Sequence, residues 1–193
     1  MSLEVIVGCM YSGKTEELVR RLRRATIAGQ KVTTFKSAID TRYDNAKIAT
    51  HLGDTLSAFP VRSAIAIRHF LSEKPTPQVI GFDEAQFMEP EIIPLLETFA
   101  NTGIRVIVAG LDQDYLGKPF GPIPHLMAIA DEVTKLQAIC VAPHPNDLTE
   151  KVCGQPATRS YRVPDADTGE QVQVGSDGIY EARCRPCWNR GQP

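Results

Sequence analysis

Hydrophobic and polar residues follow one another along the first two thirds of the chain in an order that predicts strands alternating with helices. Short apolar runs at residues 3–7, 32–35, 79–82 and 104–111 predict buried strands. Between them, apolar residues recur at helical spacing at Leu18, Leu22 and Ala25, at Ala64, Ile67 and Leu71, and at Ile92, Leu96 and Phe99. This alternation predicts an α/β fold with a mainly parallel sheet flanked by helices.

Two segments depart from this pattern. Residues 36–60 have no clear period and are predicted to form a long polar loop. From Gln137 onward the helical periodicity ends, and Gly, Pro, Asp and Thr dominate. A segment of this composition has too few apolar residues to build a core of its own. We therefore expect a core domain over residues 1–136 and a small loop-rich domain over residues 137–193.

Residues 8–15 read Gly-Cys-Met-Tyr-Ser-Gly-Lys-Thr, which is the G-x-x-x-x-G-K-[ST] pattern of a phosphate-binding loop, or P-loop. The pattern stands between an apolar run and a helical stretch, as the motif requires. Gly8 and Gly13 would let the backbone amides turn toward phosphates. Lys14 would reach the phosphates with its charge, and the Thr15 hydroxyl would be a ligand of Mg²⁺. The chain is therefore predicted to have a P-loop NTPase-like fold and to use a nucleoside triphosphate.

Asp83 and Glu84 follow the apolar run at residues 79–82, where a P-loop protein has its acidic partner. Asp83 can hold Mg²⁺, directly or through water. Glu84 would orient a water molecule in an ATPase, or accept the proton of the attacking hydroxyl in a small-molecule kinase. Arg42, in the polar segment, is a candidate for stabilising charge on the transferred phosphoryl group. The arginine pairs at residues 20–21 and 23–24 indicate a solvated or subunit-contact helix face.

Four of the five cysteines lie in the C-terminal segment, at Cys140, Cys153, Cys184 and Cys187. Four thiolates are the ligand set of a tetrahedral structural Zn²⁺, and a bound metal would supply the stability that this segment lacks. Residues 141–152 make the spacing of the first pair unusually wide. His144 is therefore an alternative to Cys140 as the first ligand.

Composition limits the classes of partner. The chain has 193 residues and a formal net charge of −2, which gives no general attraction to nucleic acid or to a membrane surface. Glu4 interrupts the first apolar run, and no stretch of 18 apolar residues follows, so neither a secretory signal nor a membrane span is expected. We expect a cytoplasmic protein whose cysteines are thiols or metal ligands.

Six stretches of sequence, in this order, resemble a known family. They are residues 10–15 (Met-Tyr-Ser-Gly-Lys-Thr), 40–43 (Asp-Thr-Arg-Tyr), 83–87 (Asp-Glu-Ala-Gln-Phe), 110–121 (Gly-Leu-Asp-Gln-Asp-Tyr leading to Pro-Phe-Gly), 135–140 (Lys-Leu-Gln-Ala-Ile-Cys) and 174–187 (Val-Gly, Tyr180 and the final Cys-x-x-Cys). Together they resemble the thymidine kinases of animals and many bacteria, which combine a P-loop kinase core with a zinc-binding lasso domain. The resemblance covers nearly the whole chain.

The resemblance implies ATP-dependent phosphorylation of the 5′-hydroxyl of thymidine, and of deoxyuridine, in nucleotide salvage for DNA synthesis. It implies that Glu84 is the general base and that Lys14 and Arg42 are catalytic as well. It places ATP and Mg²⁺ at Gly8, Met10, Ser12, Gly13, Lys14, Thr15, Asp83 and Gln86. It places the nucleoside at Met10, Leu111, Tyr115, Phe120, Gln173, Val174 and Tyr180.

The resemblance also implies a homotetramer, feedback inhibition by thymidine triphosphate, and a Zn²⁺ that fixes the base of the loop closing over the nucleoside. Loss of the metal is then expected to loosen thymidine binding more than ATP binding. The family's first two cysteines normally form a close pair, so the wide spacing here is a departure. The alternative is a P-loop ATPase with a zinc-ribbon module that binds nucleic acid, supported only by Arg183, Arg185 and Arg190 near the last cysteines. No Asn-Lys-x-Asp signature is present, which argues against a GTPase.

Overall fold

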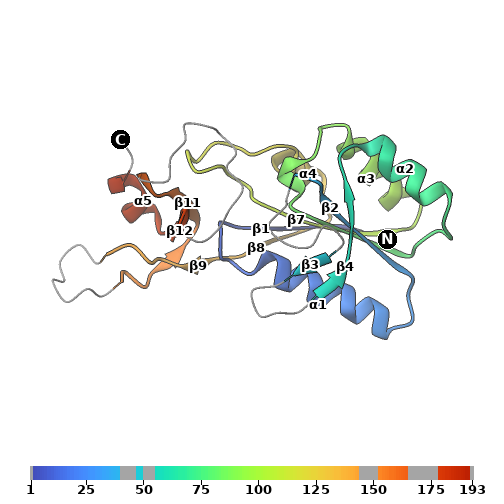
Figure 1. The fold of residues 1–193 in the computed structure, drawn as a ribbon, viewed down its shortest axis with the longest axis horizontal. Helices are drawn as coiled ribbons and strands as arrows, with labels where there is room; N and C mark the ends of the chain where they lie inside the picture. The colour runs from blue at the N-terminus through green and yellow to red at the C-terminus, as the bar shows by residue number, and fades with distance from the viewer. Residues whose placement is uncertain (1, 40–46, 50–54, 144–151, 165–177, 192–193) are drawn as a thin grey trace.

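The structure is a computed structural model, and it describes residues 2–39, 47–49, 55–143, 152–164 and 178–191. Its centre is a six-stranded sheet in the order β5-β2-β6-β7-β1-β8 (Figure 1). These strands are β5 (Phe59–Val61), β2 (Val32–Ser37), β6 (Val79–Asp83), β7 (Arg105–Gly110), β1 (Leu3–Val7) and β8 (Glu132–Lys135). All five pairings between them are parallel, which confirms the predicted mainly parallel α/β fold.

Helices cover both faces of this sheet. Helix α1 (Lys14–Ile27) lies on one face, and α2 (Ala64–Ser72), α3 (Ile92–Asn101) and α4 (Ile123–Ile129) lie on the other (Figure 1). Strand β1 shows how the sequence sets the two layers, because side chains alternate along a strand. Its Val5 packs in the core beneath α3 and α4, whereas its Ile6 packs against Leu18 and Leu22 of α1. The buried strands therefore have apolar residues in succession, as a sheet covered on both faces requires.

The helix starts have recognisable local causes. Gly13, in the left-handed conformation, is the N-cap of α1. The Ser63 hydroxyl accepts a hydrogen bond from the amide of Ala66 at 3.2 Å and so caps α2. Helix α3 begins two residues after Pro90. The three predicted helices and four predicted strands are all present, with ends shifted by one or two residues.

The prediction of one long loop over residues 36–60 is wrong for the parts that the structure describes. Strand β2 continues to Ser37, and β3 (Lys47–Ala49) pairs antiparallel with β4 (Thr55–Ser57). Strand β5 then joins the sheet beside β2. Its central residue is Pro60, which has no backbone N–H and is tolerated because β5 lies at the edge of the sheet.

Two further elements of the core were not predicted. Helix α4 has only seven residues, which is too short to show a clear period. Strand β8 reads Glu-Val-Thr-Lys and, among the described strands, pairs only with β1, so it lies at the edge of this sheet. Charged side chains on an edge strand discourage pairing with other chains. Because of these charged residues, β8 contains no apolar run and was not predicted as a strand.

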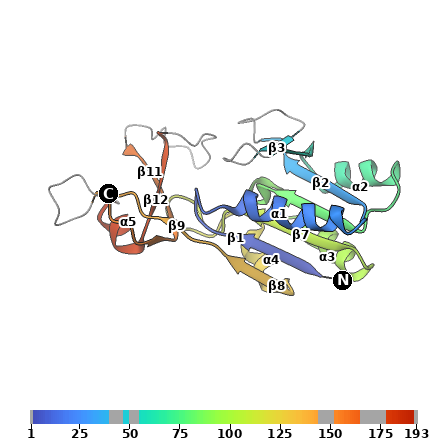
Figure 2. The same ribbon diagram turned by 90° about the horizontal axis from the view of Figure 1, so that it is seen from below.

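The C-terminal module lies off the carboxyl ends of the parallel strands (Figures 1 and 2). It contains the pairs β9 (Ala138–Ile139) with β10 (Pro156–Ala157) and β11 (Arg159–Arg162) with β12 (Tyr180–Arg183), followed by α5 (Arg185–Gly191). Helix α5 was not predicted, because the segment shows no helical periodicity. The buried apolar cluster of the module consists of alanines and cysteines, which agrees with the predicted lack of a large apolar core. Among the described residues, no helix of the protein is long and apolar enough to span a membrane.

Candidate active site and metal centre

The P-loop joins β1 to α1 and has the shape of an anion-binding turn. Gly8 has a φ of 152°, and a Cβ at this position would lie 2.6 Å from the carbonyl oxygen of Leu136. Gly13 has a φ of 80° and leads directly into the first turn of α1. Both conformations disfavour any residue with a side chain. The glycines therefore allow the close turn at the helix N-terminus that binds phosphate groups in proteins.

Lys14 lies across this loop. Its Nζ donates a hydrogen bond to the carbonyl oxygen of Cys9 at 2.8 Å, and the Ser12 hydroxyl donates to the same oxygen at 2.8 Å. Burial lowers the pKa of Lys14, while the negative charge of Glu84 opposes this change. The ammonium group is thus held beside the acidic residues at the end of β6, where a phosphate chain would meet it.

Thr15 and Asp83 lie in direct contact. The Thr15 hydroxyl donates to the Asp83 carboxylate, with distances of 3.2 and 3.4 Å to its two oxygens. A hydroxyl and a carboxylate at the end of a P-loop are the ligands that Mg²⁺ uses with nucleotide phosphates. The residues present therefore fit the predicted metal-nucleotide site, and the arrangement agrees with the spacing that the sequence motifs indicate.

Glu84 has a strained backbone. Its φ of 52° and ψ of 40° are left-handed, a conformation that side chains other than Asn and Asp seldom adopt. The amide of Glu84 donates to the Asp83 carboxylate at 3.1 Å, which helps to hold this turn. Such strain is concentrated at functional sites because the surrounding structure has to maintain it. Because the backbone turns at Glu84, its side chain does not follow the alternation of side chains along β6.

Gln86 connects Glu84 to the neighbouring strand. Its Nε2 donates a hydrogen bond to the Glu84 carboxylate, and its Oε1 accepts one from the amide of Leu111 at 3.0 Å. Gln86 is buried, and Gly110 and Gly121 leave the space that its side chain and backbone occupy. Both ends of the amide are engaged within the protein. The sequence predicts that Gln86 contacts ATP or Mg²⁺, and that contact stays a prediction.

Several residues predicted to bind the nucleoside gather on the loop after β7 and on β12. Arg162 of β11 brings two of them together: its guanidinium lies 3.7 Å from the centre of the Tyr115 ring and donates to the Tyr180 hydroxyl at 2.8 Å. Tyr11 in the P-loop donates to the carbonyl oxygen of Tyr180 at 3.2 Å. Sequence reasoning missed Arg162, because an arginine in a short strand belongs to no motif.

Other predicted residues are separate from this group or outside the described part of the chain. Leu111 lies at the end of β7, and Phe120 packs edge-on against Phe87 with ring centres 5.6 Å apart. Met10 donates its amide to the Ser160 hydroxyl at 3.1 Å. Arg42, Gln173, Val174 and the alternative metal ligand His144 lie outside the described residues, so their predicted roles stay predictions.

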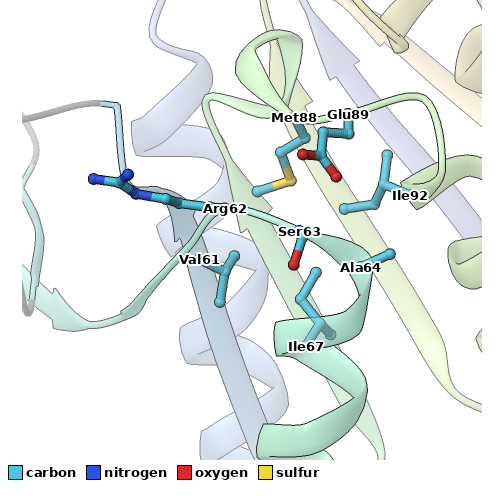
Figure 3. A pocket seen from close by; sticks show the side chains of 8 residues that line it. All are labelled: Val61, Arg62, Ser63, Ala64, Ile67, Met88, Glu89 and Ile92. Atoms are coloured by element: carbon cyan, nitrogen blue, oxygen red, sulfur yellow. The ribbon is translucent and has the colours of Figure 1, made fainter.

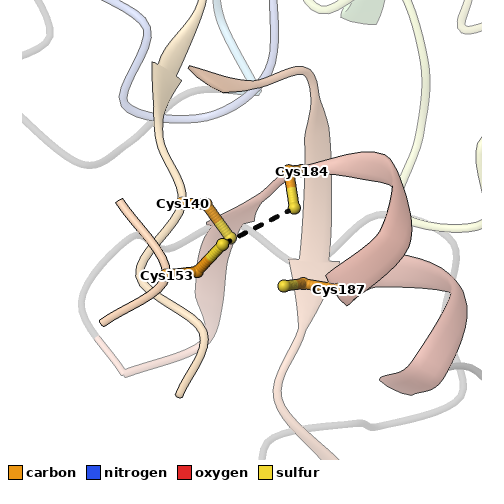
Figure 4. A group of neighbouring side chains, drawn as sticks. All are labelled: Cys140, Cys153, Cys184 and Cys187. Carbon is orange, nitrogen blue, oxygen red and sulfur yellow. Dashed lines mark hydrogen bonds between the residues drawn. The ribbon is translucent and has the colours of Figure 1, made fainter. Parts of the chain in front are cut away.

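The four C-terminal cysteines form one cluster (Figure 4). The sulfur atoms of Cys140, Cys153, Cys184 and Cys187 all lie within 4.8 Å of one another, and those of Cys153 and Cys184 are 3.9 Å apart. Zn–S bonds of about 2.3 Å in a tetrahedron require sulfur atoms about 3.8 Å apart. Burial raises the pKa of Cys187 to about 12, so this sulfur needs a nearby cation to be a thiolate at neutral pH. The donor set therefore fits a structural Zn²⁺.

A β-hairpin accommodates the wide spacing of the first two cysteines. The amide of Gly154 donates to the carbonyl oxygen of Cys140 at 3.0 Å, and the amide of Cys153 donates to that of Ala142 at 2.8 Å. Pairing continues outward to Pro143 and Val152. The described ends of this stretch, residues 140–143 and 152–154, thus lie side by side and bring Cys153 next to Cys140. A close pair of ligands is kept without a close spacing in sequence.

A separate hollow between α2 and α3 does not compete with this site (Figure 3). It is lined by Val61, Arg62, Ser63, Ala64, Ile67, Met88, Glu89 and Ile92. Small-molecule sites usually enclose about 300–1,000 Å³. The space here leaves no room even for a water molecule. We therefore assign no ligand to it.

Comparison with known proteins agrees with the geometry. The family model "Thymidine kinase" matches residues 1–188. The thymidine kinase of Bacteroides fragilis (strain YCH46) is 47% identical over 188 residues, covering 97% of this chain and 87% of that protein. The thymidine kinase of Bacteroides thetaiotaomicron is 46% identical over 190 residues, covering 98% and 88%. A solved DNA replication initiation factor aligns with 70% of this chain and 40% of that chain, at 13% identity and a TM-score of 0.43, which is too weak a likeness to carry an inference. The chain belongs to the thymidine kinase family.

Proposed function

We propose that the protein transfers the γ-phosphate of ATP to the 5′-hydroxyl of thymidine, and to that of deoxyuridine, in nucleotide salvage. The observation that carries this proposal is the contact of Thr15 with Asp83, the residue before Glu84, which supports a metal-nucleotide site beside Glu84. A carboxylate beside the transferred phosphate is suited to accept the proton of an attacking hydroxyl. Family membership supplies the identity of the nucleoside.

The proposed roles follow the positions of the groups. Glu84 removes the proton from the 5′-hydroxyl as its oxygen bonds to the γ-phosphorus, while the bond from that phosphorus to the β–γ bridging oxygen breaks and ADP leaves. Lys14 and Arg42 stabilise the charge that develops on the phosphoryl oxygens. Thr15 and Asp83 would hold Mg²⁺, which would neutralise phosphate charge when bound. Gly8, Met10, Ser12 and Gly13 supply the surrounding loop, and Gln86 keeps the Glu84 carboxylate in place.

The nucleoside is proposed to lie between the loop after β7 and the C-terminal module. Met10, Leu111, Tyr115, Phe120, Gln173, Val174 and Tyr180 are the proposed contacts. An aromatic ring such as Tyr115 can pack on a pyrimidine face. A pocket whose polar groups match thymine rejects nucleosides that leave those groups unpaired. Purine nucleosides should therefore be poor substrates.

The remaining expectations are also proposals. Residues 1–136 form the kinase core and residues 137–193 the lasso domain, with a structural Zn²⁺ at the cysteine cluster. The protein acts in the cytoplasm as a homotetramer, and thymidine triphosphate inhibits it by occupying the site. The exposed residues Arg20, Arg23 and Arg24 of α1 remain a candidate subunit-contact face, whereas Arg21 is buried against Glu4 and is not part of it.

A coupled assay tests the function. ATP consumption is measured with and without thymidine, and thymidine monophosphate is identified directly as the product. We expect ATP consumption to depend on thymidine and to match the monophosphate formed. ATP consumption that proceeds equally without thymidine would instead indicate an ATPase. Deoxyguanosine and deoxyadenosine serve as controls, and phosphorylation of either as fast as thymidine would contradict the proposed substrate.

A further inference from the structure

Trp188, the only tryptophan of the chain, is the neighbour in sequence of Cys187 of the cysteine cluster. It lies in the first turn of α5, one residue after Cys187, and its amide donates to the carbonyl oxygen of Cys184 at 2.9 Å. The position of its indole is therefore set by the same turn that carries two of the four thiols.

The indole N–H lies between two segments that are far apart in the sequence. Trp188 Nε1 is 3.1 Å from the carbonyl oxygen of Ser160 and 3.2 Å from that of Tyr115. An indole has one donor and no acceptor, so the two carbonyls share a single hydrogen. Sharing requires both carbonyls to converge on one point, which fixes the distance between the two segments.

Each of these two segments lies beside the proposed binding site of a different substrate. The Ser160 hydroxyl accepts the amide hydrogen of Met10 at 3.1 Å and so holds the P-loop. Tyr115 lies on the loop after β7, and its ring is covered by the Arg162 guanidinium. One side of the indole contact thus serves the phosphate end of the site, and the other side serves the nucleoside end.

Packing around the indole fixes its place. Gly117, two residues after Tyr115, brings the backbone so close that a Cβ there would lie 3.1 Å from the ring. Arg159, which precedes Ser160 on β11, has its guanidinium 5.4 Å from the centre of the Trp188 ring. The ring is therefore fitted between the same two segments that its N–H connects.

We propose that Trp188 is a positioning residue that sets the P-loop and the nucleoside loop at their working distance, acting through Ser160 and Tyr115. This inference rests on the proposed function only for the identity of the two ligands. Without the indole N–H, two carbonyls lose their common donor and the two loops are free to separate. Each ligand then has to bring the two loops together when it binds, and the free-energy cost of doing so lowers the affinity for both ligands.

The decisive experiment compares Trp188→Phe with the wild-type protein, because phenylalanine keeps an aromatic ring and removes the donor. Dissociation constants for thymidine and for a non-hydrolysable ATP analogue are measured separately, together with kcat. We expect both dissociation constants to rise by about 5- to 30-fold, in line with the loss of a buried hydrogen bond. Asn189→Ala, an exposed change on the same helix, is the matched control and should leave both constants unchanged.

A second variant separates the two ends. Ser160→Ala removes the acceptor for the Met10 amide but keeps the Ser160 carbonyl, so it should weaken binding of the ATP analogue more than that of thymidine. In the double variant with Trp188→Phe, the losses in affinity for the ATP analogue should be less than additive. Both changes interrupt the same path of contacts, which runs from Trp188 through Ser160 to the Met10 amide. Fully additive losses would contradict the path through Ser160.

The outcomes distinguish this inference from the proposed function. If Trp188→Phe holds its zinc and binds both ligands as the wild type does, the positioning role is wrong, whether or not thymidine is phosphorylated. If the wild type forms no thymidine monophosphate, the proposed function is wrong, and the two dissociation constants still decide the role of Trp188. If the variant loses zinc or fails to fold, the fluorescence of Trp188 in the wild type decides. A change in emission on adding each ligand supports the inference, and no change with either ligand overturns it.

Discussion

The Thr15 hydroxyl and the Asp83 carboxylate lie 3.2 Å apart although 68 residues separate them in the chain. They come from the start of α1 and the end of β6, and β7 lies between β6 and β1 in the sheet. All these strands are parallel, so their carboxyl ends and the helix starts that follow them meet at one edge. The contact shows that the P-loop and the acidic motif form one site, with Glu84 as the next residue along.

The first prediction concerns proton transfer by Glu84. Glu84→Gln keeps the size of the side chain and removes its basicity, so kcat for thymidine phosphorylation should fall by about two to four orders of magnitude. Dissociation constants for thymidine and ATP should change little. Glu89→Gln, at an exposed position five residues later, is the matched control. Near-normal turnover of Glu84→Gln would remove Glu84 from the role of general base.

The second prediction concerns Gln86. Gln86→Leu leaves the Glu84 carboxylate without one donor and the Leu111 amide without its acceptor. We expect kcat to fall about tenfold and the free energy of unfolding to fall by about 1–3 kcal/mol, the cost of an unsatisfied buried group. Rapid kinetics and urea unfolding measure the two effects. If kcat stays at the wild-type value while stability falls, Gln86 stabilises the fold without positioning Glu84.

The main elements of the site could be predicted from the sequence because each has a strong local signal. The P-loop needs glycine at two defined turns, and the acidic pair has to follow an apolar strand. The polar strand β8 has no such signal, since its charges suit an exposed edge. Arg162, Ser160 and Trp188 also escaped prediction. Their partners lie in other segments, and only the folded chain brings them together.

The cysteine cluster shows a different limit. Four thiols are visible in the sequence, which leaves the choice between Cys140 and His144 open. The sequence does not show that residues 140–143 pair with residues 152–154, because the hydrogen bonds between them join backbone groups. Backbone pairing leaves little trace in residue type at positions such as Ala142 and Val152. The wide spacing of Cys140 and Cys153 is compatible with one metal site because backbone pairing holds the two cysteines side by side.

The third prediction follows from this hairpin. Replacing residues 144–151 by Asn-Gly, a two-residue turn suited to hairpins, should leave the Pro143 and Val152 pairing intact. Elemental analysis should then find about one zinc per chain, as in the wild type. His144→Ala should also retain zinc, whereas Cys140→Ala should lose it. Zinc that survives loss of Cys140 but not of His144 would show that the histidine is the ligand.

The fourth prediction concerns metal removal. The resemblance alone favours an effect mainly on thymidine, but the module also contacts the P-loop. The Cys9 thiol donates to the carbonyl oxygen of Ala157 at 3.3 Å, and Ser160 holds the Met10 amide. Treatment with a chelator should therefore weaken binding of an ATP analogue as well as of thymidine, and added Zn²⁺ should restore both. Calorimetry measures both affinities, and unchanged ATP affinity after complete removal of zinc would contradict this coupling.

The last prediction concerns acid stability and a buried ion pair at the other end of the sheet. The side chain of Glu4 is only 7% exposed and contacts Arg21 at 2.7 Å and Arg105 at 2.6 Å. Burial alone would raise the pKa of Glu4, but the hydrogen bonds from Arg105 and Arg21 outweigh it and leave the pKa below its usual value. Hydrogen bonds from Arg20 and Arg21 likewise lower the pKa of Glu17 to about 2.

Both carboxylates bind a proton more weakly in the folded chain than in the unfolded chain, whose glutamate pKa is about 4.3. Their contribution to stability is therefore complete above about pH 5 and is lost as the pH falls toward about 2. Glu4→Gln should lower the free energy of unfolding at pH 7 by about 1.5–3 kcal/mol, because charge-assisted hydrogen bonds to Arg21 and Arg105 are lost while Arg21 keeps its other carboxylate partners. The exposed change Glu97→Gln is the control. Acid also releases zinc from thiolates, but it does so in the wild type and in Glu4→Gln alike. The difference between these two proteins in urea unfolding should therefore shrink as the pH falls from 5 to 3, and a difference that stays constant would show that the Glu4 charge is not its source.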